Sequence, residues 1–121
     1  MIKLSNAEWK IMNLLWEQVP RTMIQITKAL WEETGWTKHT VITYLKRMEE
    51  KGAVRHEEGG RAKLYFAAMR QDDAMAQETD SLLDRVFQGN AGLMISTMIE
   101  QSPLTETELQ ELYAVLEKKQ K

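Results

Sequence analysis

The chain has 121 residues, of which 43% are hydrophobic and 28% charged, and it contains no cysteine. This length suffices for one small domain or a domain with an appendage. The lack of cysteine excludes disulfides, thiolate zinc sites and a cysteine nucleophile. No apolar run approaches the roughly 18 residues of a membrane span, and the amino terminus has no signal-peptide core. We therefore expect a cytoplasmic protein that does not insert into a membrane.

The net charge of −2 conceals an asymmetry along the chain. Residues 1–71 carry 12 lysines and arginines against 8 acidic residues, whereas residues 72–121 carry 4 against 10. A basic part beside an acidic part indicates that the first meets a polyanion, although uneven surface charge without a function is the alternative. We predict two domains, residues 1–71 and 72–121.

Two helices are predicted at the start of the basic part. Ser5 with Glu8 three positions later has the spacing of a capping box, in which each residue satisfies a backbone donor of the other. Thr22 and Gln25 repeat this signature, and Gly35 is a good left-handed terminator for the second helix.

The third helix is expected between Thr37, a further N-cap, and Gly52. Apolar residues recur along it at helical spacing and predict one buried face. These residues are Val41, Tyr44, Leu45 and Met48.

Beyond Gly52 the hydrophobic period changes from about 3.6 residues to about 2. Val54 and His56 alternate with charged residues, a glycine turn follows at residues 58–61, and the apolar Leu64 and Phe66 then alternate with Lys63 and Tyr65. The pattern predicts a β-hairpin with a basic tip. Three helices followed by a two-stranded ribbon is the order of a winged helix-turn-helix, so the predicted fold class is mainly α with a small β-hairpin.

The side of the third helix opposite its apolar face carries hydroxyl and cationic groups. A recognition helix needs such groups to reach base edges and neutralise phosphates, and its N-terminus attracts phosphate. Arg47 can bind a guanine or a phosphate with two hydrogen bonds, whereas Lys46 acts as a point charge. A solvated helix face without a ligand is the alternative. The predicted DNA-binding residues are Thr37, Lys38, His39, Thr40, Thr43, Lys46 and Arg47 on this helix, and Arg61 and Lys63 on the hairpin.

Further helices are predicted in the acidic part, from Asp72 to the break at Gly89, then up to Pro103, and from the N-cap Thr105 onward. About 50 residues with this much apolar surface are marginally stable alone. We expect a second copy to cover them; a monomer whose tail folds back on the hairpin is the alternative. A two-fold dimer would hold two recognition helices about one DNA turn, roughly 34 Å, apart. The predicted dimerisation residues are Leu82, Leu83, Val86, Phe87, Met94, Ile95, Met98, Leu109, Leu112, Tyr113 and Leu116.

Catalytic and metal sites are not predicted. The two histidines, His39 and His56, are expected on different elements without a spaced acidic partner, and no nucleophile-base arrangement is present. The methionines fall on apolar stripes and are expected to fill the core rather than bind copper. The four that define this expectation are Met12, Met48, Met75 and Met98. We expect no cofactor.

Two segments and the acidic tail resemble the penicillinase repressor family, the BlaI/MecI/CopY-type bacterial regulators. The segments are LSNAEWKIMNLLW and GWTKHTVITYLKRMEEKGAVRHEEGGRAKLYF. The resemblance covers nearly the whole chain and implies a homodimeric repressor whose winged helix binds palindromic operators, often with TACA/TGTA-like half-sites. Ile42 stands where some members carry lysine. The positions that match the family's recognition helix and wing are Thr37, Thr40, Thr43, Arg47 and Arg61.

The resemblance says less about how the repressor is released. In β-lactam-responsive members a membrane sensor protease system leads to cleavage of an Asn-Phe peptide, which corresponds here to Thr97-Met98. This departure disfavours a β-lactam role, and copper sensing through a terminal cysteine cluster is disfavoured because the chain has no cysteine. Another protease, a small ligand or protein level remain open as signals.

The predicted function is that of a sequence-specific DNA-binding repressor with double-stranded DNA and a second copy of itself as partners. Two alternatives stay open at this point. One is a winged-helix module that binds a protein through the same basic face. The other is a winged-helix regulator whose tail binds a small ligand.

Overall fold

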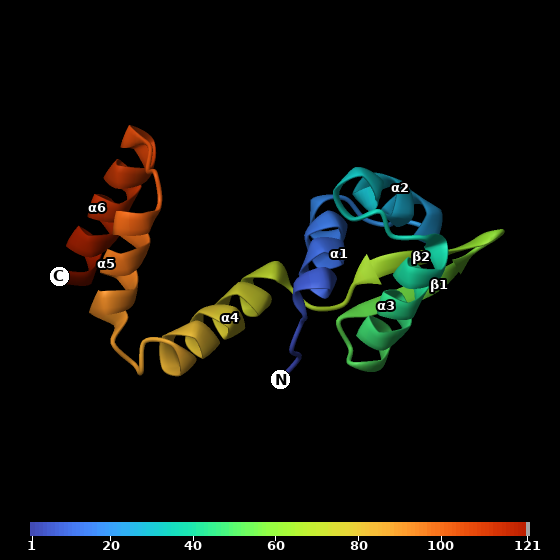
Figure 1. Cartoon of the computed structure of the whole chain (residues 1–121), viewed down its shortest axis with the longest axis horizontal. Coiled ribbons are helices and arrows are strands. Elements are labelled where there is room, and N and C mark those ends of the chain that lie inside the picture. Colours follow the sequence, from blue (N-terminus) through green and yellow to red (C-terminus); the bar gives the residue numbers. More distant parts are fainter. Residues whose placement is uncertain (121) are drawn as a thin grey trace. The chain divides into compact units, whose positions relative to one another are not determined.

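The computed structural model describes residues 1–120 and contains, within them, six helices and a two-stranded antiparallel sheet (Figure 1). The elements in chain order are α1 (Asn6–Glu17), α2 (Met23–Thr34), α3 (Lys38–Glu50), β1 (Val54–Gly59), β2 (Ala62–Ala67), α4 (Gln71–Arg85), α5 (Ala91–Gln101) and α6 (Glu106–Gln120). The chain divides into two compact units, Met1–Ala76 and Gln77–Lys121. The order of elements in the first unit confirms the predicted winged helix-turn-helix.

Local hydrogen bonds begin the helices where the sequence predicts. The Ser5 hydroxyl accepts from the Glu8 amide at 3.2 Å, and the Ser5 amide donates to the Glu8 carboxylate at 2.8 Å. Thr22 and Gln25 form the same capping box at α2. Gly35 ends α2 with φ +67°, a conformation that favours glycine because it has no Cβ.

The core of the first unit lies between α1, α2, α3 and the hairpin. Met12 and Met48 are completely buried in it, which confirms core filling for these two methionines. Its other completely buried large side chains are Ile11, Leu15, Ile26, Val41 and Leu45. Tyr44, predicted on the same stripe, is half-buried and packs against Trp36 with a ring-centroid distance of 5.0 Å.

The hairpin pairs β1 with β2 from Val54 opposite Ala67 to Gly59 opposite Ala62. On its other edge β2 bridges to Arg21, since the Tyr65 amide donates to the Arg21 carbonyl at 2.8 Å and the Arg21 amide donates to the Tyr65 carbonyl at 3.2 Å. Residues 54–67 thus form a wing in which β2 lies between β1 and Arg21.

The structure decides which face of β2 points inward. Tyr65 is the inward residue, with only 4% of its surface exposed, while Leu64 and Phe66 lie on the opposite face and are half-buried. The alternation gave the correct period but could not choose the face, because each set contains an aromatic residue. The choice is made by the pairing of Tyr65 with both Arg21 and His56.

The second unit is built from capped helices with little enclosed core. Asn90 caps α5 through its side-chain oxygen, which accepts from the Leu93 amide at 3.0 Å. Thr105 and Glu108 form a capping box at α6, as the predicted cap at Thr105 requires. Among the described residues of this unit, Met94 is the one large hydrophobic residue that is buried.

Two of the methionines expected in a core are exposed instead. Met75 is 52% exposed and Met98 is 53% exposed, so core filling is wrong for both within a single chain. Apolar periodicity predicts which face of a helix will be covered but not by what. No helix among residues 1–120 combines the length and the apolar character that crossing a bilayer requires.

Candidate nucleic-acid interface

The surface of α3 that faces away from the core carries the predicted contact residues. Because Val41, Leu45 and Met48 are completely buried, the residues on the other side of the helix project into solvent. The structure places Thr40 at the margin, half-buried, and leaves exposed Thr37, Lys38, His39, Thr43, Lys46 and Arg47. The structure therefore brings these seven predicted residues to one helix and one surface.

The N-terminus of α3 is arranged to receive an anion. The Thr37 hydroxyl accepts from the Thr40 amide at 3.3 Å, and the first turn of the helix contains no acidic residue. Lys38 lies in that turn, where the partial positive charge of the helix N-terminus makes a cation unfavourable unless an anion approaches. A phosphate at this position would satisfy both the free backbone amides and the lysine.

The hydroxyl groups of this surface are not equivalent. Thr43 donates its hydroxyl hydrogen to the His39 carbonyl at 2.9 Å, so only the oxygen lone pairs remain for an external partner. The Thr37 hydroxyl accepts from the Thr40 amide and also lies 3.3 Å from the Thr40 hydroxyl, and either of the two hydroxyls can donate to the other. Thr43 is thus an acceptor, suited to a base amino group, whereas Thr37 and Thr40 share a hydroxyl contact.

The cations of α3 have no competing partners. Among residues 1–120, none of Lys38, Lys46 and Arg47 takes part in an ion pair. The guanidinium of Arg47 lies 5.9 Å from the centre of the Tyr44 ring, which packs on Trp36. An aromatic surface behind a guanidinium restricts its motion without using its donors.

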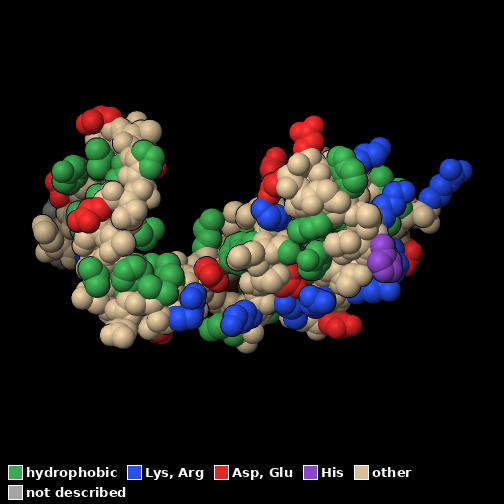
Figure 2. Space-filling model, viewed as in Figure 1, with side chains coloured by type: hydrophobic (Ala, Val, Ile, Leu, Met, Phe, Trp, Pro, Cys, Tyr) green, Lys and Arg blue, Asp and Glu red, His purple; other side chains and the backbone are tan. Residues whose placement is uncertain are grey.

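The wing carries the two remaining predicted contacts. Arg61 is exposed at the turn beside Gly60, whose φ is +83°, and it forms no ion pair with any described residue. Lys63 is exposed on β2 directly opposite Glu58, so an acidic neighbour offsets part of its charge. Figure 2 shows Lys and Arg side chains around α3 and at the tip of the hairpin.

Arg55 is a wing cation that is already engaged. Its guanidinium lies 4.2 Å from the centre of the Phe66 ring and 3.3 Å from the Glu57 carboxylate. It therefore differs from Arg61, whose donors have no recorded partner among residues 1–120.

One contact joins α3 to the wing and is not predictable from the sequence. Oε2 of Glu49 in the last turn of α3 lies 2.6 Å from Nδ1 of His56 in β1. The expectation that His56 lacks a spaced acidic partner is therefore wrong. The signal available in the sequence was a helix-terminal acid seven residues before a strand histidine, which does not specify a contact.

A buried carboxylate fixes α1 to the C-terminal end of α3. Glu8 is 1% exposed and its Oε1 accepts from Lys51 Nζ at 2.8 Å. Burial alone raises the pKa of Glu8, but the hydrogen bonds from Lys51 and Ser5 outweigh it, so the pKa lies below the ordinary value.

The predicted dimerisation residues divide into two classes. Met94 is buried, and Leu82, Leu83, Phe87 and Leu109 are half-buried. The remaining six are between 37% and 66% exposed, and they are Val86, Ile95, Met98, Leu112, Tyr113 and Leu116.

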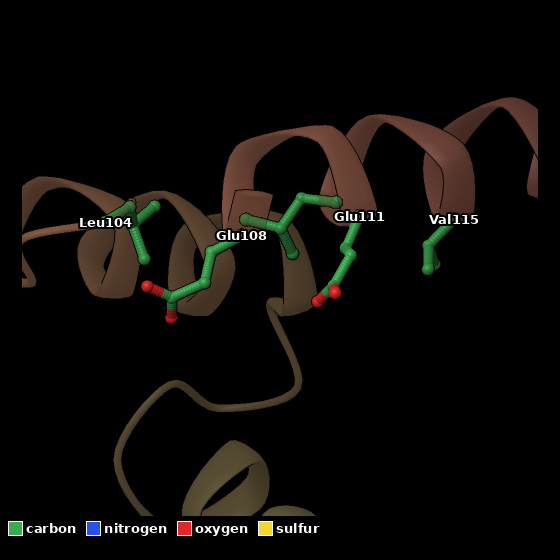
Figure 3. A pocket seen from close by; sticks show the side chains of 5 residues that line it. Leu104, Glu108, Glu111 and Val115 are labelled. Atoms are coloured by element: carbon green, nitrogen blue, oxygen red, sulfur yellow. The ribbon is translucent and has the colours of Figure 1, made fainter. Parts of the chain in front are cut away.

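Two open grooves lie along α5 and α6 and the segment that joins them. One of about 230 Å³ is lined almost entirely by apolar side chains, including Ile95, Met98 and Leu112. The other, of about 310 Å³, is lined by Leu104, Glu108, Glu111, Leu112 and Val115. Figure 3 shows that the carboxylates of Glu108 and Glu111 project from α6 on the same side as Val115. No group of three or more His, Asp or Glu residues within residues 1–120 could hold a metal ion.

The sequence is similar to known repressors over nearly its whole length. A family model described as penicillinase repressor matches residues 4–118. The penicillinase repressor of Bacillus licheniformis is 29% identical over 115 residues, which cover 95% of this chain and 90% of that protein. The methicillin resistance regulatory protein MecI of Staphylococcus aureus strain N315 is 22% identical over 117 residues, covering 97% and 95%.

The fold of the first unit is similar to solved DNA-binding domains. The solution structure of the DNA-binding domain of the repressor BlaI superposes with a TM-score of 0.55 at 28% identity, covering 60% of this chain and 88% of that chain. The solution structure of monomeric Bacillus licheniformis BlaI in complex with the blaP half-operator gives a TM-score of 0.53 at 28% identity, covering 60% and 90%.

Proposed function

The chain belongs to the penicillinase repressor family of winged-helix, DNA-binding transcriptional repressors, and from this premise we propose that it binds a palindromic operator as a homodimer. In this proposal α3 enters the major groove and the wing follows the adjacent backbone or minor groove. Membership also confirms the prediction of a repressor rather than an enzyme. Because we propose that its ligand is DNA, we also propose a cytoplasmic location.

One observation carries the DNA-binding role of α3. A single exposed helix face combines three cations without ion pairs among residues 1–120, an acceptor hydroxyl and an N-terminus free of acidic residues. A helix face that served only solvation would be expected to pair its cations with acids three or four residues away.

Roles for individual residues follow from these surroundings. Arg47, backed by the Tyr44 ring, is proposed to bind a guanine or a phosphate through two donors. Lys38 and Lys46 are proposed to neutralise phosphates. Thr43 is proposed to accept from a base amino group, because its own hydrogen is already used. His39, Thr37 and Thr40 complete the surface, and Arg61 and Lys63 extend it along the wing.

The proposed dimer depends on the apolar surface of the second unit. Fully covering a Val, Leu, Ile, Phe or Met side chain is worth ~1.5–3 kcal/mol. Six of the predicted dimerisation residues are exposed in the single chain. A second copy would cover them by two-fold symmetry, so we propose residues 72–121 as the dimerisation domain.

Release of the repressor by a sensor protease would require α5 to open locally. Thr97 and Met98 lie inside α5, and the Thr97 hydroxyl donates to the Leu93 carbonyl at 2.7 Å. A peptide bond inside a helix must unwind before a protease can cleave it. A membrane sensor protease system is therefore a partner of this chain only if α5 opens locally.

Selection of bound duplexes from a random pool, followed by footprinting, tests this proposal. We expect a protected sequence with two symmetric half-sites whose centres are about 10 base pairs, or a multiple, apart. A dimer that contacts about 6–10 phosphates should lose ~10³–10⁵ in affinity between about 50 and 200 mM salt. Salt-independent binding without a protected site would favour the protein-interaction module instead.

A further inference from the structure

We propose that the Glu49–His56 pair positions the wing on the recognition helix, so that these two residues control the DNA contact of Arg61 without touching DNA themselves. The inference rests on the proposed function, because it assumes that α3 and the wing bind one duplex. It adds two residues whose role is to orient another group.

The pair joins the last turn of α3 to the middle of β1. Glu49 Oε2 and His56 Nδ1 are 2.6 Å apart, close enough for Nδ1 to donate a hydrogen bond to the carboxylate. The two side chains are 36% and 27% exposed. A contact with this degree of burial is screened less by salt than an exposed ion pair.

The Glu49–His56 contact lies where the exposed outer part of the hairpin begins, so a shift at this contact would move the wing tip. His56 lies opposite Tyr65, which is buried, and the two rings are 5.9 Å apart. Beyond His56 and Tyr65, all residues from position 57 to position 63 are exposed. Two attachments therefore hold the wing at this level, namely Glu49 to β1 and Arg21 to β2.

An isolated two-stranded hairpin has little stability in water, so its direction depends on what holds its base. Three rungs of the ladder extend beyond His56, ending at the pair of Gly59 and Ala62. Arg61 lies in the turn past this last rung. A small rotation of β1 at His56 would consequently move Arg61 through a much larger distance.

The charges around His56 come from each element packed against it. Glu49 approaches from α3, Tyr65 from β2, and Glu58 and Lys63 occupy the same face of the hairpin nearer the tip. Burial raises the pKa of Tyr65, and the carboxylates of Glu49 and Glu58 raise it further, which places both acids near this face. An acid beside a DNA-binding surface repels phosphate, and the contact with His56 directs Glu49 to the wing instead.

The test is a double-mutant cycle between Glu49→Ala and Arg61→Ala. Its probe is a duplex of about 30 base pairs selected from the random pool, long enough for two half-sites. In the unaltered protein, Arg61→Ala should weaken binding roughly ten-fold and lower the salt slope by about one unit. In the Glu49→Ala background, Arg61→Ala should weaken binding less than about two-fold, because the guanidinium no longer reaches the duplex.

Two control variants separate positioning from charge and from folding. Glu50→Ala removes the same charge from the neighbouring position of α3, where the residue is exposed and makes no ion pair with a described residue, and it should leave the Arg61 effect intact. His56→Asn keeps a donor near the position of Nδ1 and should restore most of the Arg61 effect that His56→Ala abolishes. A general loss of structure would not be repaired by this conservative change.

Equal weakening by Arg61→Ala with and without Glu49 would overturn the positioning role and leave the proposed function intact. The positioning role would also fall if Arg61→Ala had no effect while Arg47→Ala weakened binding. If neither arginine mattered, the proposed function itself would fail. An Arg61 effect confined to proteins that retain the pair is the result that supports the inference.

Discussion

The ammonium group of Lys51 lies 2.8 Å from Oε1 of Glu8, a carboxylate of which only 1% is exposed, and links the C-terminal end of α3 to the first turn of α1. The same ammonium donates to the Lys3 carbonyl at 2.8 Å. Glu8 also completes the capping box with Ser5, whereas its second oxygen is buried and accepts no hydrogen bond from residues 1–120. One residue therefore joins the N-terminal cap of α1 to the C-terminal end of α3.

Replacing Lys51 with methionine should destabilise the first unit by about 2–3 kcal/mol. The substitution leaves the buried Glu8 carboxylate without its cation, which costs more than the loss of an exposed pair. Urea denaturation followed by tryptophan fluorescence measures the change. Lys46→Met is the matched control, since Lys46 is exposed and unpaired among residues 1–120. Equal stability of the two variants would contradict the role given to Lys51.

The stability that Glu8 contributes should depend on pH in the acidic range. Its pKa in the folded chain is lowered, because hydrogen bonds from Lys51 and Ser5 outweigh burial. The charged form therefore stabilises the fold fully above the unfolded value, about 4.3, and this contribution disappears as the pH falls through the lower folded value. Glu8→Gln should be clearly less stable than the unaltered protein at pH 7, and the gap should narrow below about pH 4. Urea midpoints measured from pH 7 downward would reveal a constant gap if this explanation were incorrect.

Arg47 and Lys46 are adjacent on α3 and should behave differently when each is replaced with alanine. If the Arg47 guanidinium binds a base, Arg47→Ala should weaken binding to the selected operator by ~1–3 kcal/mol and reduce discrimination against other sequences. Lys46→Ala should weaken all duplexes alike and flatten the salt slope by about one unit. Titrations with selected and random duplexes at several salt concentrations distinguish the two. Unchanged affinity in both variants would remove α3 as the recognition helix.

Leu112 and Leu116 should be required for dimerisation. They are 37% and 52% exposed in the single chain, and replacing both with glutamate would place two charges in the proposed interface. We expect monomers by sedimentation and a loss of operator affinity much larger than the loss of winged-helix stability, because two half-site contacts act together. Gln110→Glu adds a charge at another exposed position of α6 and serves as the control. A dimer that survives the double substitution would place the interface elsewhere.

The sequence by itself was sufficient for features that depend on neighbours a few residues apart. The caps at Ser5, Thr22, Thr37 and Thr105 were predictable because a side chain and the amide that it caps are three positions apart. The buried stripe of α3 was predictable because helical geometry repeats along the chain. Once that stripe is buried, the exposed face of α3 follows.

Only the tertiary structure decided features that join distant segments. Tyr65 faces the core because Arg21, 44 positions earlier, pairs with it, and the period of a strand is the same for either face. Lys51 meets Glu8 across 43 positions, and Glu49 meets His56 across a helix end and a turn. Such contacts depend on how the elements pack, and the local spacing of residue types carries no information about packing.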